Sequence, residues 1–118
     1  MDEYTLKWLY DIKQAITEIE SYFDGKDMDF LQYRNNIMLK RAVERDLEII
    51  GEALNRILKR DENYQDKISH ARSIVGLRNH VIHAYDSVSD ENIWSILIAH
   101  LPKLKNEIDS LIDKNGDF

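Results

Sequence analysis

Apolar residues recur every three or four positions through most of this sequence, and this spacing restricts the fold more than any other feature. It places the side chains on one face of an α-helix, as in the series Leu9, Ile12, Ile16, Ile19 and Phe23. The 118 residues include only 4 glycines and 1 proline, too few for the turns of a sandwich or barrel of many short strands. The sequence therefore predicts an all-α fold, an up-and-down bundle of about four helices with one long helix.

The first two helical segments account for the N-terminal half of the chain. The first ends at the polar turn Asp24-Gly25-Lys26-Asp27, and the second covers about residues 30–59. At 1.5 Å per residue the second helix would be about 45 Å long, which exceeds the width of a compact domain and predicts an elongated bundle or a dimer. Its apolar side is predicted to comprise Tyr33, Ile37, Leu47, Ile50, Leu54 and Leu58.

Two further helices follow a polar connection over residues 61–66. The third covers about residues 73–84, and the fourth begins near Ser89-Asp90-Glu91, whose acidic side chains favour a helix N-terminus. Pro102 lies inside the fourth helix, where a proline removes a backbone hydrogen bond and bends the axis. The apolar side of this helix is predicted to comprise Ile93, Leu97, Leu101, Leu104, Ile108 and Leu111.

The composition restricts the compartment and the chemistry. The chain has no cysteine, which excludes disulfides, thiolate metal sites and cysteine nucleophiles. It has no run of 18 apolar residues, and its N-terminus lacks the basic and apolar regions of a signal peptide. No repeat, low-complexity tract or linker interrupts residues 1–118. We therefore expect a single helical domain in the cytoplasm, without membrane contact.

The charge of the chain is acidic overall but unevenly distributed. The net charge is −6, from 16 Lys and Arg against 22 Asp and Glu, which disfavours non-specific binding to nucleic acid. Residues 66–85 nevertheless contain Lys67, Arg72 and Arg78 against the single acid Asp66, together with three of the four histidines. Any contact with an anion such as phosphate is therefore expected in this basic window.

Within the basic window, residues 78–85 read Arg-Asn-His-Val-Ile-His-Ala-Tyr. On a helix with about 100° per residue, Tyr85 lies about 20° from Arg78, Asn79 about 100° and His83 about 140°, so these four share the outer half. His80 points about 200° from Arg78, near the far edge of the apolar stripe. That stripe is expected to comprise Ile74, Leu77, Val81 and Ala84. It explains the helix, but it does not explain four polar side chains on the outer half.

These four side chains suit metal-free cleavage of RNA. Histidine can accept and donate a proton near neutral pH, and arginine presents a permanently charged fork that fits a phosphate. We expect a neighbouring 2′-hydroxyl to attack the phosphorus while His83 moves the proton and Arg78 stabilises the developing charge. Asn79 could hold a phosphate oxygen or orient the imidazole, and Tyr85 could hydrogen-bond or stack on a base. On one helix the Arg78 and His83 side chains point about 140° apart, so they cannot both reach one phosphate. Either the helix ends near His83 or two chains complete one site.

Two other interpretations of the histidines fit the residues. His80 and His83, three positions apart, could share a metal, but no third ligand and no His-Glu signature accompany them. His83 and Tyr85 could instead be the polar tips of a helix end, bonded to the backbone. The clustering of four such side chains in the one basic window favours a catalytic site without a metal or another cofactor.

Residues 78–85 match the R-N-x-x-x-H-x-Y motif of the HEPN superfamily, and the chain resembles the HepT toxin branch of that superfamily. The other segments that carry the resemblance are residues 42–45, 50–53, 75–77, 93–94 and 101–102. The resemblance implies an all-α homodimer that cleaves RNA as the toxin of a toxin–antitoxin pair. It also implies that Arg78 and His83 form the catalytic pair, around a cleft between the two protomers.

The same resemblance implies a protein partner. In this branch a cognate minimal nucleotidyltransferase is the antitoxin and transfers AMP to the motif tyrosine, here Tyr85. Since Tyr85 lies about 20° from Arg78 on an ideal helix, an attached adenylyl phosphate would pair with the guanidinium and repel the RNA. The superfamily also contains members without nuclease activity. A non-catalytic module that binds the nucleotidyltransferase or a nucleotide is therefore the alternative function.

Overall fold

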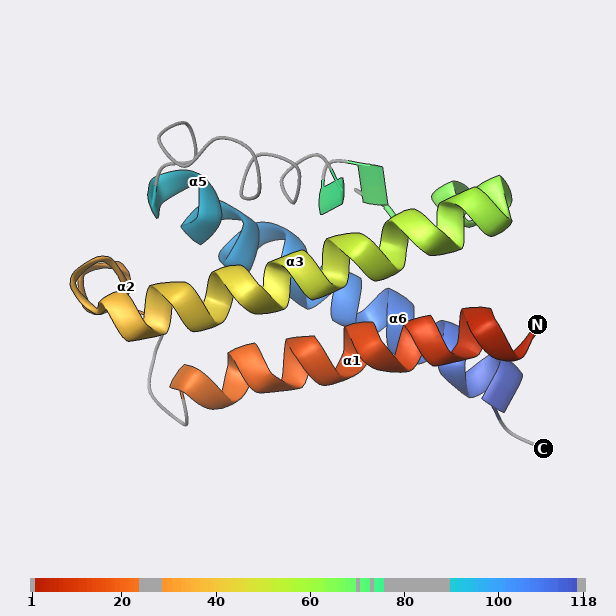
Figure 1. Ribbon diagram of the computed structural model, residues 1–118, viewed down its shortest axis with the longest axis horizontal. Coiled ribbons are helices and arrows are strands. Elements are labelled where there is room, and N and C mark those ends of the chain that lie inside the picture. The colour runs from red at the N-terminus through yellow and green to blue at the C-terminus, as the bar shows by residue number, and fades with distance from the viewer. Residues whose placement is uncertain (1, 24–28, 70, 73, 76–89, 117–118) are drawn as a thin grey trace.

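The computed structural model describes residues 2–23, 29–69, 71–72, 74–75 and 90–116. Over this part of the chain the regular structure is helical, without a β-strand. Helix α1 (Glu3–Phe23) and helix α3 (Ile37–Arg60) lie side by side and run in opposite directions, and helix α6 (Leu101–Gly116) packs against α1 (Figure 1). The predicted all-α bundle is confirmed. None of the described helices is both long and apolar enough to cross a membrane.

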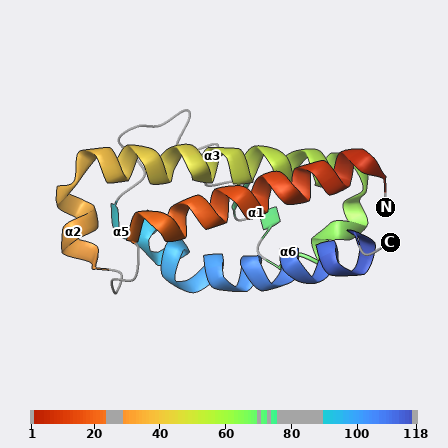
Figure 2. The same cartoon turned by 90° about the horizontal axis from the view of Figure 1, so that it is seen from below.

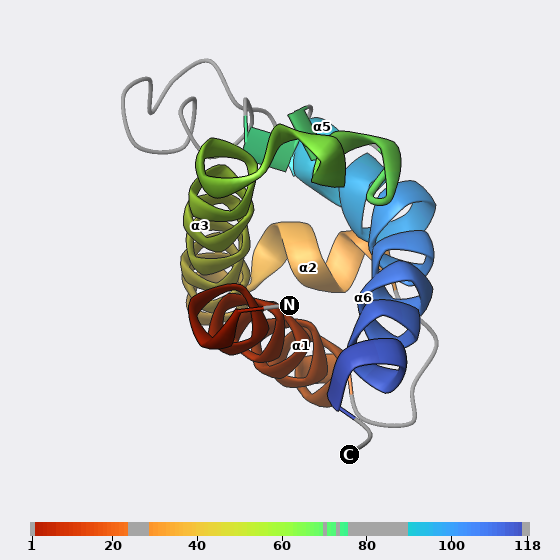
Figure 3. The same cartoon turned by 90° about the vertical axis from the view of Figure 1, so that its right-hand side faces the viewer.

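The core lies between α1, α3 and α6, which Figure 3 shows nearly end-on. All five predicted apolar residues of α1, from Leu9 to Phe23, are buried, as are Leu47, Ile50 and Leu54 of α3. Burial of one such Leu or Ile side chain contributes about 1.5–3 kcal/mol, so these faces account for the association of the helices. The molecule measures 44 × 32 × 19 Å, which confirms the predicted elongated shape.

The predicted second helix is wrong in one respect, because residues 30–59 form two helices. Helix α2 (Phe30–Asn35) and helix α3 are separated at Asn36, whose backbone is extended with φ −112° and ψ 99°. The Asn36 Oδ1 accepts a hydrogen bond from the Leu39 amide at 3.0 Å. This cap satisfies a free N–H of the first turn of α3 and lets a new helix begin in a new direction. Helix α2 therefore lies across one end of the bundle (Figure 2).

The change of direction at Asn36 also exposes one side chain, Ile37, that was predicted to lie on the apolar side. Tyr33 on α2 is fully buried, as predicted, whereas Ile37 is 65% exposed, so its predicted place on the apolar side is wrong. Ile37 is the first residue of α3, and the break at Asn36 turns it away from the core. The remaining predicted members of this apolar side are buried.

The predicted fourth helix forms as helix α5 (Asp90–Ser95), a π-helical turn η2 (Ile96–His100) and helix α6. Its six predicted apolar residues, from Ile93 to Leu111, are all buried. The Leu101 amide donates to the Ile96 carbonyl, five residues earlier, immediately before Pro102. A proline lacks an N–H and its ring clashes with the carbonyl four residues earlier, so a wider turn accommodates it. The disturbance expected at Pro102 therefore takes the form of a π-turn.

The predicted polar connection after α3 is a short 3-10 helix, η1 (Glu62–Asp66). Asp61 begins it, because its Oδ1 accepts a hydrogen bond from the Asn63 amide at 3.0 Å. Ile74 and Val75, from the predicted third helix, are helical. Residues 73 and 76–84 of that helix lie outside the described residues, as does the predicted turn at residues 24–27.

Candidate functional site

The four residues of the predicted catalytic cluster lie outside the described residues. These residues are Arg78, Asn79, His83 and Tyr85. The same holds for His80 and for most of the apolar stripe predicted behind the cluster. Ile74 is the described member of that stripe, and it is buried, with 2% of its surface exposed. The shared outer face of the motif thus stays a prediction. The segments described on either side of the motif are residues 71–72 and 74–75 before it and the chain from Asp90 after it.

The N-terminal side of the motif is anchored by apolar burial and by a polar contact. Ile68, Ala71 and Ile74 are buried and recur every three residues, which places them together against the core. Ser69 donates to the carboxylate of Glu107 on α6 from its amide, at 2.8 Å, and from its hydroxyl, at 2.9 Å. The approach to the motif is therefore attached to a helix that lies 38 residues further along the chain.

Two cations of the basic window lie in the described part of the chain, and both are exposed. The Arg72 Nε donates to the Gln65 Oε1 at 3.0 Å, and the Lys67 Nζ lies 4.7 Å from the centroid of the Tyr64 ring. Neither contact neutralises the positive charge, because an amide and an aromatic ring are both uncharged. Positive charge is thus accessible at the N-terminal approach to the motif, whereas the contact with phosphate stays a prediction.

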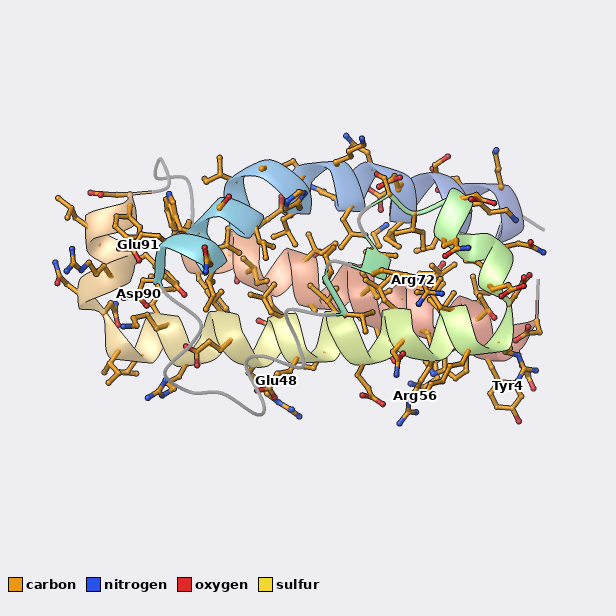
Figure 4. All side chains as sticks on the ribbon, turned by 90° about the horizontal axis from the view of Figure 1, so that it is seen from above. Tyr4, Glu48, Arg56, Arg72, Asp90 and Glu91 are labelled. Atoms are coloured by element: carbon orange, nitrogen blue, oxygen red, sulfur yellow. The ribbon has the colours of Figure 1, made fainter. Side chains whose placement is uncertain are left out.

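On the C-terminal side of the motif, the described residues begin again at Asp90. Asp90 is the first residue of α5 and follows Tyr85 by five residues. The Nζ of Lys40 on α3 lies 3.2 Å from both carboxylate oxygens of Asp90. Figure 4 shows Asp90 and Glu91 near the α2 end of the molecule, whereas Arg72 lies toward the opposite end. The two flanks of the motif are therefore attached at different ends of the bundle.

An aromatic cluster supports α5 at this end of the bundle. The Trp94 ring packs against three other rings, with centroid distances of 6.0 Å to Phe23, 5.7 Å to Phe30 and 5.5 Å to Tyr33. Such tilted and edge-on pairs add about 0.5–1.5 kcal/mol each beyond the area that they bury. Helix α5 is therefore packed on α1 and α2 one turn after the residue that pairs with Lys40.

A groove of about 320 Å³ lies between α1 and α3, on a face whose α3 residues Glu48 and Arg56 are labelled in Figure 4. Its basic side chains all have acidic partners. The pairs are Lys7 with Asp11 at 2.8 Å, Arg45 with Glu48 at 3.5 Å, and Arg56 with Glu52 at 3.0 Å. Because these charges cancel, the groove offers an RNA phosphate less than the exposed cations of the basic window do.

A buried acid, Asp46, lies between α1 and α3 and was not singled out by the sequence analysis. Asp46 is 2% exposed, and the Tyr22 hydroxyl donates to its Oδ2 at 2.7 Å. Burial, together with a hydrogen bond to Glu18 and the charge of that residue, raises the pKa of Asp46 to about 6, against the opposing effects of Tyr22 and Arg45. The hydrogen bond to Asp46, followed by burial, raises the pKa of Tyr22 to about 12.

The sequence did contain a signal that Asp46 is a buried carboxyl. Position 46 falls on the helical stripe formed by Val43, Leu47 and Ile50, all of which are buried. An acid at an apolar position of an amphipathic helix must find polar partners inside the protein. A closer examination of that stripe could have identified Asp46 as a buried carboxyl, but the partner Tyr22, on another helix, could not be found from spacing.

Metal ligation was an alternative interpretation of the motif histidines. In the described ranges no three His, Cys, Asp or Glu side chains gather into a group that could hold a metal ion. His80 and His83 themselves lie outside those ranges. Their interpretation as metal ligands therefore stays an untested alternative.

Comparisons with known proteins point to a ribonuclease family. The sequence model of the family described as "Ribonuclease HepT-like" matches residues 12–111. "Putative RNase MJ0125" and "Putative RNase MJ1380" from Methanocaldococcus jannaschii are 35% and 36% identical to this chain, each over 86% of its length and 91% of their own. "Probable ribonuclease HepT" from Thermococcus cleftensis is 31% identical, over 88% of this chain and 92% of its own. No solved structure matches the chain.

Proposed function

Since the chain belongs to the ribonuclease HepT-like family of the HEPN superfamily, we propose that it is a metal-independent endoribonuclease. One observation carries the proposal. A complete R-N-x-x-x-H-x-Y motif, from Arg78 to Tyr85, lies inside the 12–111 match to that family. The exposed cations Lys67 and Arg72 precede the motif and add positive charge where an RNA strand would approach.

The proposed reaction is an internal transfer at phosphorus. The 2′-oxygen of the RNA attacks the adjacent phosphorus and forms a cyclic phosphate, while the bond to the 5′-oxygen of the next nucleotide breaks. His83 moves the proton that the 2′-hydroxyl loses or that the leaving 5′-oxygen gains, since an imidazole can do either near neutral pH. Arg78 stabilises the negative charge that develops on the phosphoryl oxygens. Asn79 and Tyr85 position the substrate.

Proposed partners follow from the family. The chain acts as the toxin of a toxin–antitoxin pair in the cytoplasm, as a homodimer whose two motifs face one cleft. Such an interface is self-complementary under two-fold symmetry, so each cleft would contain both copies of Arg78 and His83. A cognate minimal nucleotidyltransferase silences the toxin by transferring AMP to Tyr85. Mass spectrometry after co-expression should find AMP on Tyr85, and sedimentation should find a dimer at micromolar concentration.

The activity is tested by incubating the purified protein with RNA in EDTA. Cleavage that survives chelation, yields cyclic phosphate ends and disappears in His83→Ala and Arg78→Ala supports the proposal. Arg41→Ala is the matched control, because it removes an exposed arginine of α3 that pairs with Glu44 at 3.1 Å. Cleavage that requires a divalent metal, or that persists in His83→Ala, would contradict the assignment.

A non-catalytic module that binds the nucleotidyltransferase or a nucleotide is the second candidate. It is favoured by the net charge of −6 and by the paired cations of the α1–α3 groove. A wild-type protein that leaves RNA intact but forms a stable complex with the nucleotidyltransferase would support this function in place of the first.

A further inference from the structure

The ion pair between Lys40 and Asp90 joins α3 to the first residue of α5. The Lys40 Nζ lies 3.2 Å from each Asp90 carboxylate oxygen, and the two residues are 50 positions apart in the sequence. Their side chains are 23% and 26% exposed. Two other ion pairs between helices are more open, with 45% and 35% exposure for Lys13 and Asp109, and 43% and 44% for Lys105 and Glu20.

Partial burial means that water screens this ion pair less than it screens an exposed surface pair. An exposed pair contributes little to stability, because water screens the charges and both side chains lose freedom. In the Lys40–Asp90 pair both side chains are mostly buried, with 23% and 26% exposed. Both carboxylate oxygens of Asp90 share the ammonium, so the start of α5 is held along the axis of α3.

The Lys40–Asp90 pair lies close to the motif in the sequence. Asp90 follows Tyr85 by five residues and His83 by seven, and five residues span at most about 18 Å. Before the motif, Ile74 is buried and Val75 packs against the core, three residues before Arg78. After the motif, the Lys40–Asp90 pair is the first contact of the described structure, and the Trp94 cluster follows it.

We propose that the Lys40–Asp90 ion pair is a positioning contact for the R-N-x-x-x-H-x-Y motif, an inference that rests on the proposed ribonuclease function. Lys40 and Asp90 act through the chain between Tyr85 and α5, and neither touches the RNA. The Trp94 cluster sets how deeply α5 sits on the core, and the ion pair sets where its first turn lies along α3. Correct placement matters because a misplacement of about 1 Å can cost about 100-fold in rate.

Asp90 has a simpler structural role that must be separated from this one. An acid in the first turn of a helix interacts favourably with the helix dipole, so Asp90 could stabilise α5 without any partner. Lys40→Met separates the two roles, because it removes the ion pair and leaves Asp90 in place. Its unbranched apolar side chain also keeps the bulk of the lysine stem.

The test compares RNA cleavage by wild-type protein, Lys40→Met, Asp90→Asn and the double variant. A positioning contact predicts a roughly tenfold fall in kcat, with KM changed by less than about twofold, in either single variant. The double variant should be no slower than the slower single variant, because the two residues act as one unit. Lys40→Arg should restore most of the rate, since it restores the charge.

The matched control is Glu20→Gln, which breaks the inter-helix ion pair to Lys105 on the α1–α6 side of the bundle. It should leave kcat within about twofold of wild type, as expected for a surface substitution away from the motif. Circular dichroism should show all variants folded at the assay temperature. Equal kcat in Lys40→Met and wild type, or an equal fall in Glu20→Gln, would overturn the inference.

A second measurement keeps the inference independent of the ribonuclease activity. Amide hydrogen exchange of residues 78–85 should be several-fold faster in Lys40→Met than in wild type, and unchanged in Glu20→Gln. If the wild type does not cleave RNA, the proposed function fails, and this exchange still decides whether the pair positions the motif. Identical exchange in Lys40→Met and wild type would reject the positioning role.

Discussion

Replacing Asp46 with asparagine tests the electrostatics of the α1–α3 interface. Asp46 is 2% exposed, accepts a hydrogen bond from Tyr22 at 2.7 Å and has a pKa raised from 3.8 to about 6, chiefly by burial. Asparagine has the same shape as aspartate but carries no charge. It can accept a hydrogen bond from the Tyr22 hydroxyl and donate one to Glu18. Asp46→Asn should therefore keep these contacts and remove the cost of a carboxylate in a water-poor interface.

The size and the pH range of the effect follow from proton linkage. A carboxyl whose pKa is higher in the folded chain binds its proton more tightly there, so its contribution to stability is lost as the pH rises from about 4 to about 6. One pKa unit corresponds to about 1.4 kcal/mol, so the difference between 3.8 and about 6 sets an upper limit of roughly 3 kcal/mol. We expect Asp46→Asn to raise the free energy of unfolding by about 1–3 kcal/mol at about pH 7.5 and by little at about pH 4.

The assay is urea unfolding followed by circular dichroism, at a series of pH values from about 4 to about 8. The quantity to plot is the free energy of unfolding of Asp46→Asn minus that of wild type, because other titrations cancel in this difference. Asp11→Asn, which removes an exposed carboxylate of α1, controls for the change in net charge. A difference that does not change with pH, or a variant less stable than wild type at about pH 7.5, would refute the reasoning.

Three other substitutions test the core and the helix break. Tyr33→Phe removes a buried hydroxyl that has no hydrogen-bond partner in the described part of the chain, so chemical denaturation should show unchanged stability or a gain of up to about 1 kcal/mol. Leu54→Ala, at a fully buried position of α3, should cost about 2–5 kcal/mol in the same measurement. Asn36→Ala loses the hydrogen bond to the Leu39 amide and should cost about 1 kcal/mol, whereas an unchanged melting temperature would show that packing alone sets the break.

The sequence by itself determined the fold class and the apolar faces of the first and last helical segments, and it supplied a prediction for the chemistry of the motif. An apolar residue every three or four positions favours a helix with one buried face. This holds for α1 from Leu9 to Phe23 and, across α5, η2 and α6, from Ile93 to Leu111. The residue types from Arg78 to Tyr85 indicated phosphate and proton chemistry without any coordinates. The match of residues 12–111 to a ribonuclease family agrees with that interpretation.

The break at Asn36 shows where local spacing was insufficient. Residues 30–59 have a helical pattern throughout, and an asparagine inside a helix is only mildly unfavourable. The side chain of Asn36 caps α3, and the rings of Phe30 and Tyr33 on α2 pack on Trp94 of α5. Packing against α5, which lies far along the chain, therefore decided a boundary that helix propensity left open.

Only the tertiary structure decided which distant polar side chains meet. Tyr22 and Asp46 are 24 residues apart, Ser69 and Glu107 are 38 apart, and Lys40 and Asp90 are 50 apart. Each contact is partly buried, and reduced access of water strengthens a hydrogen bond or ion pair and makes an unpaired group costly. Helical periodicity describes one helix at a time, whereas these energies arise between helices, so they exist only once the bundle is assembled.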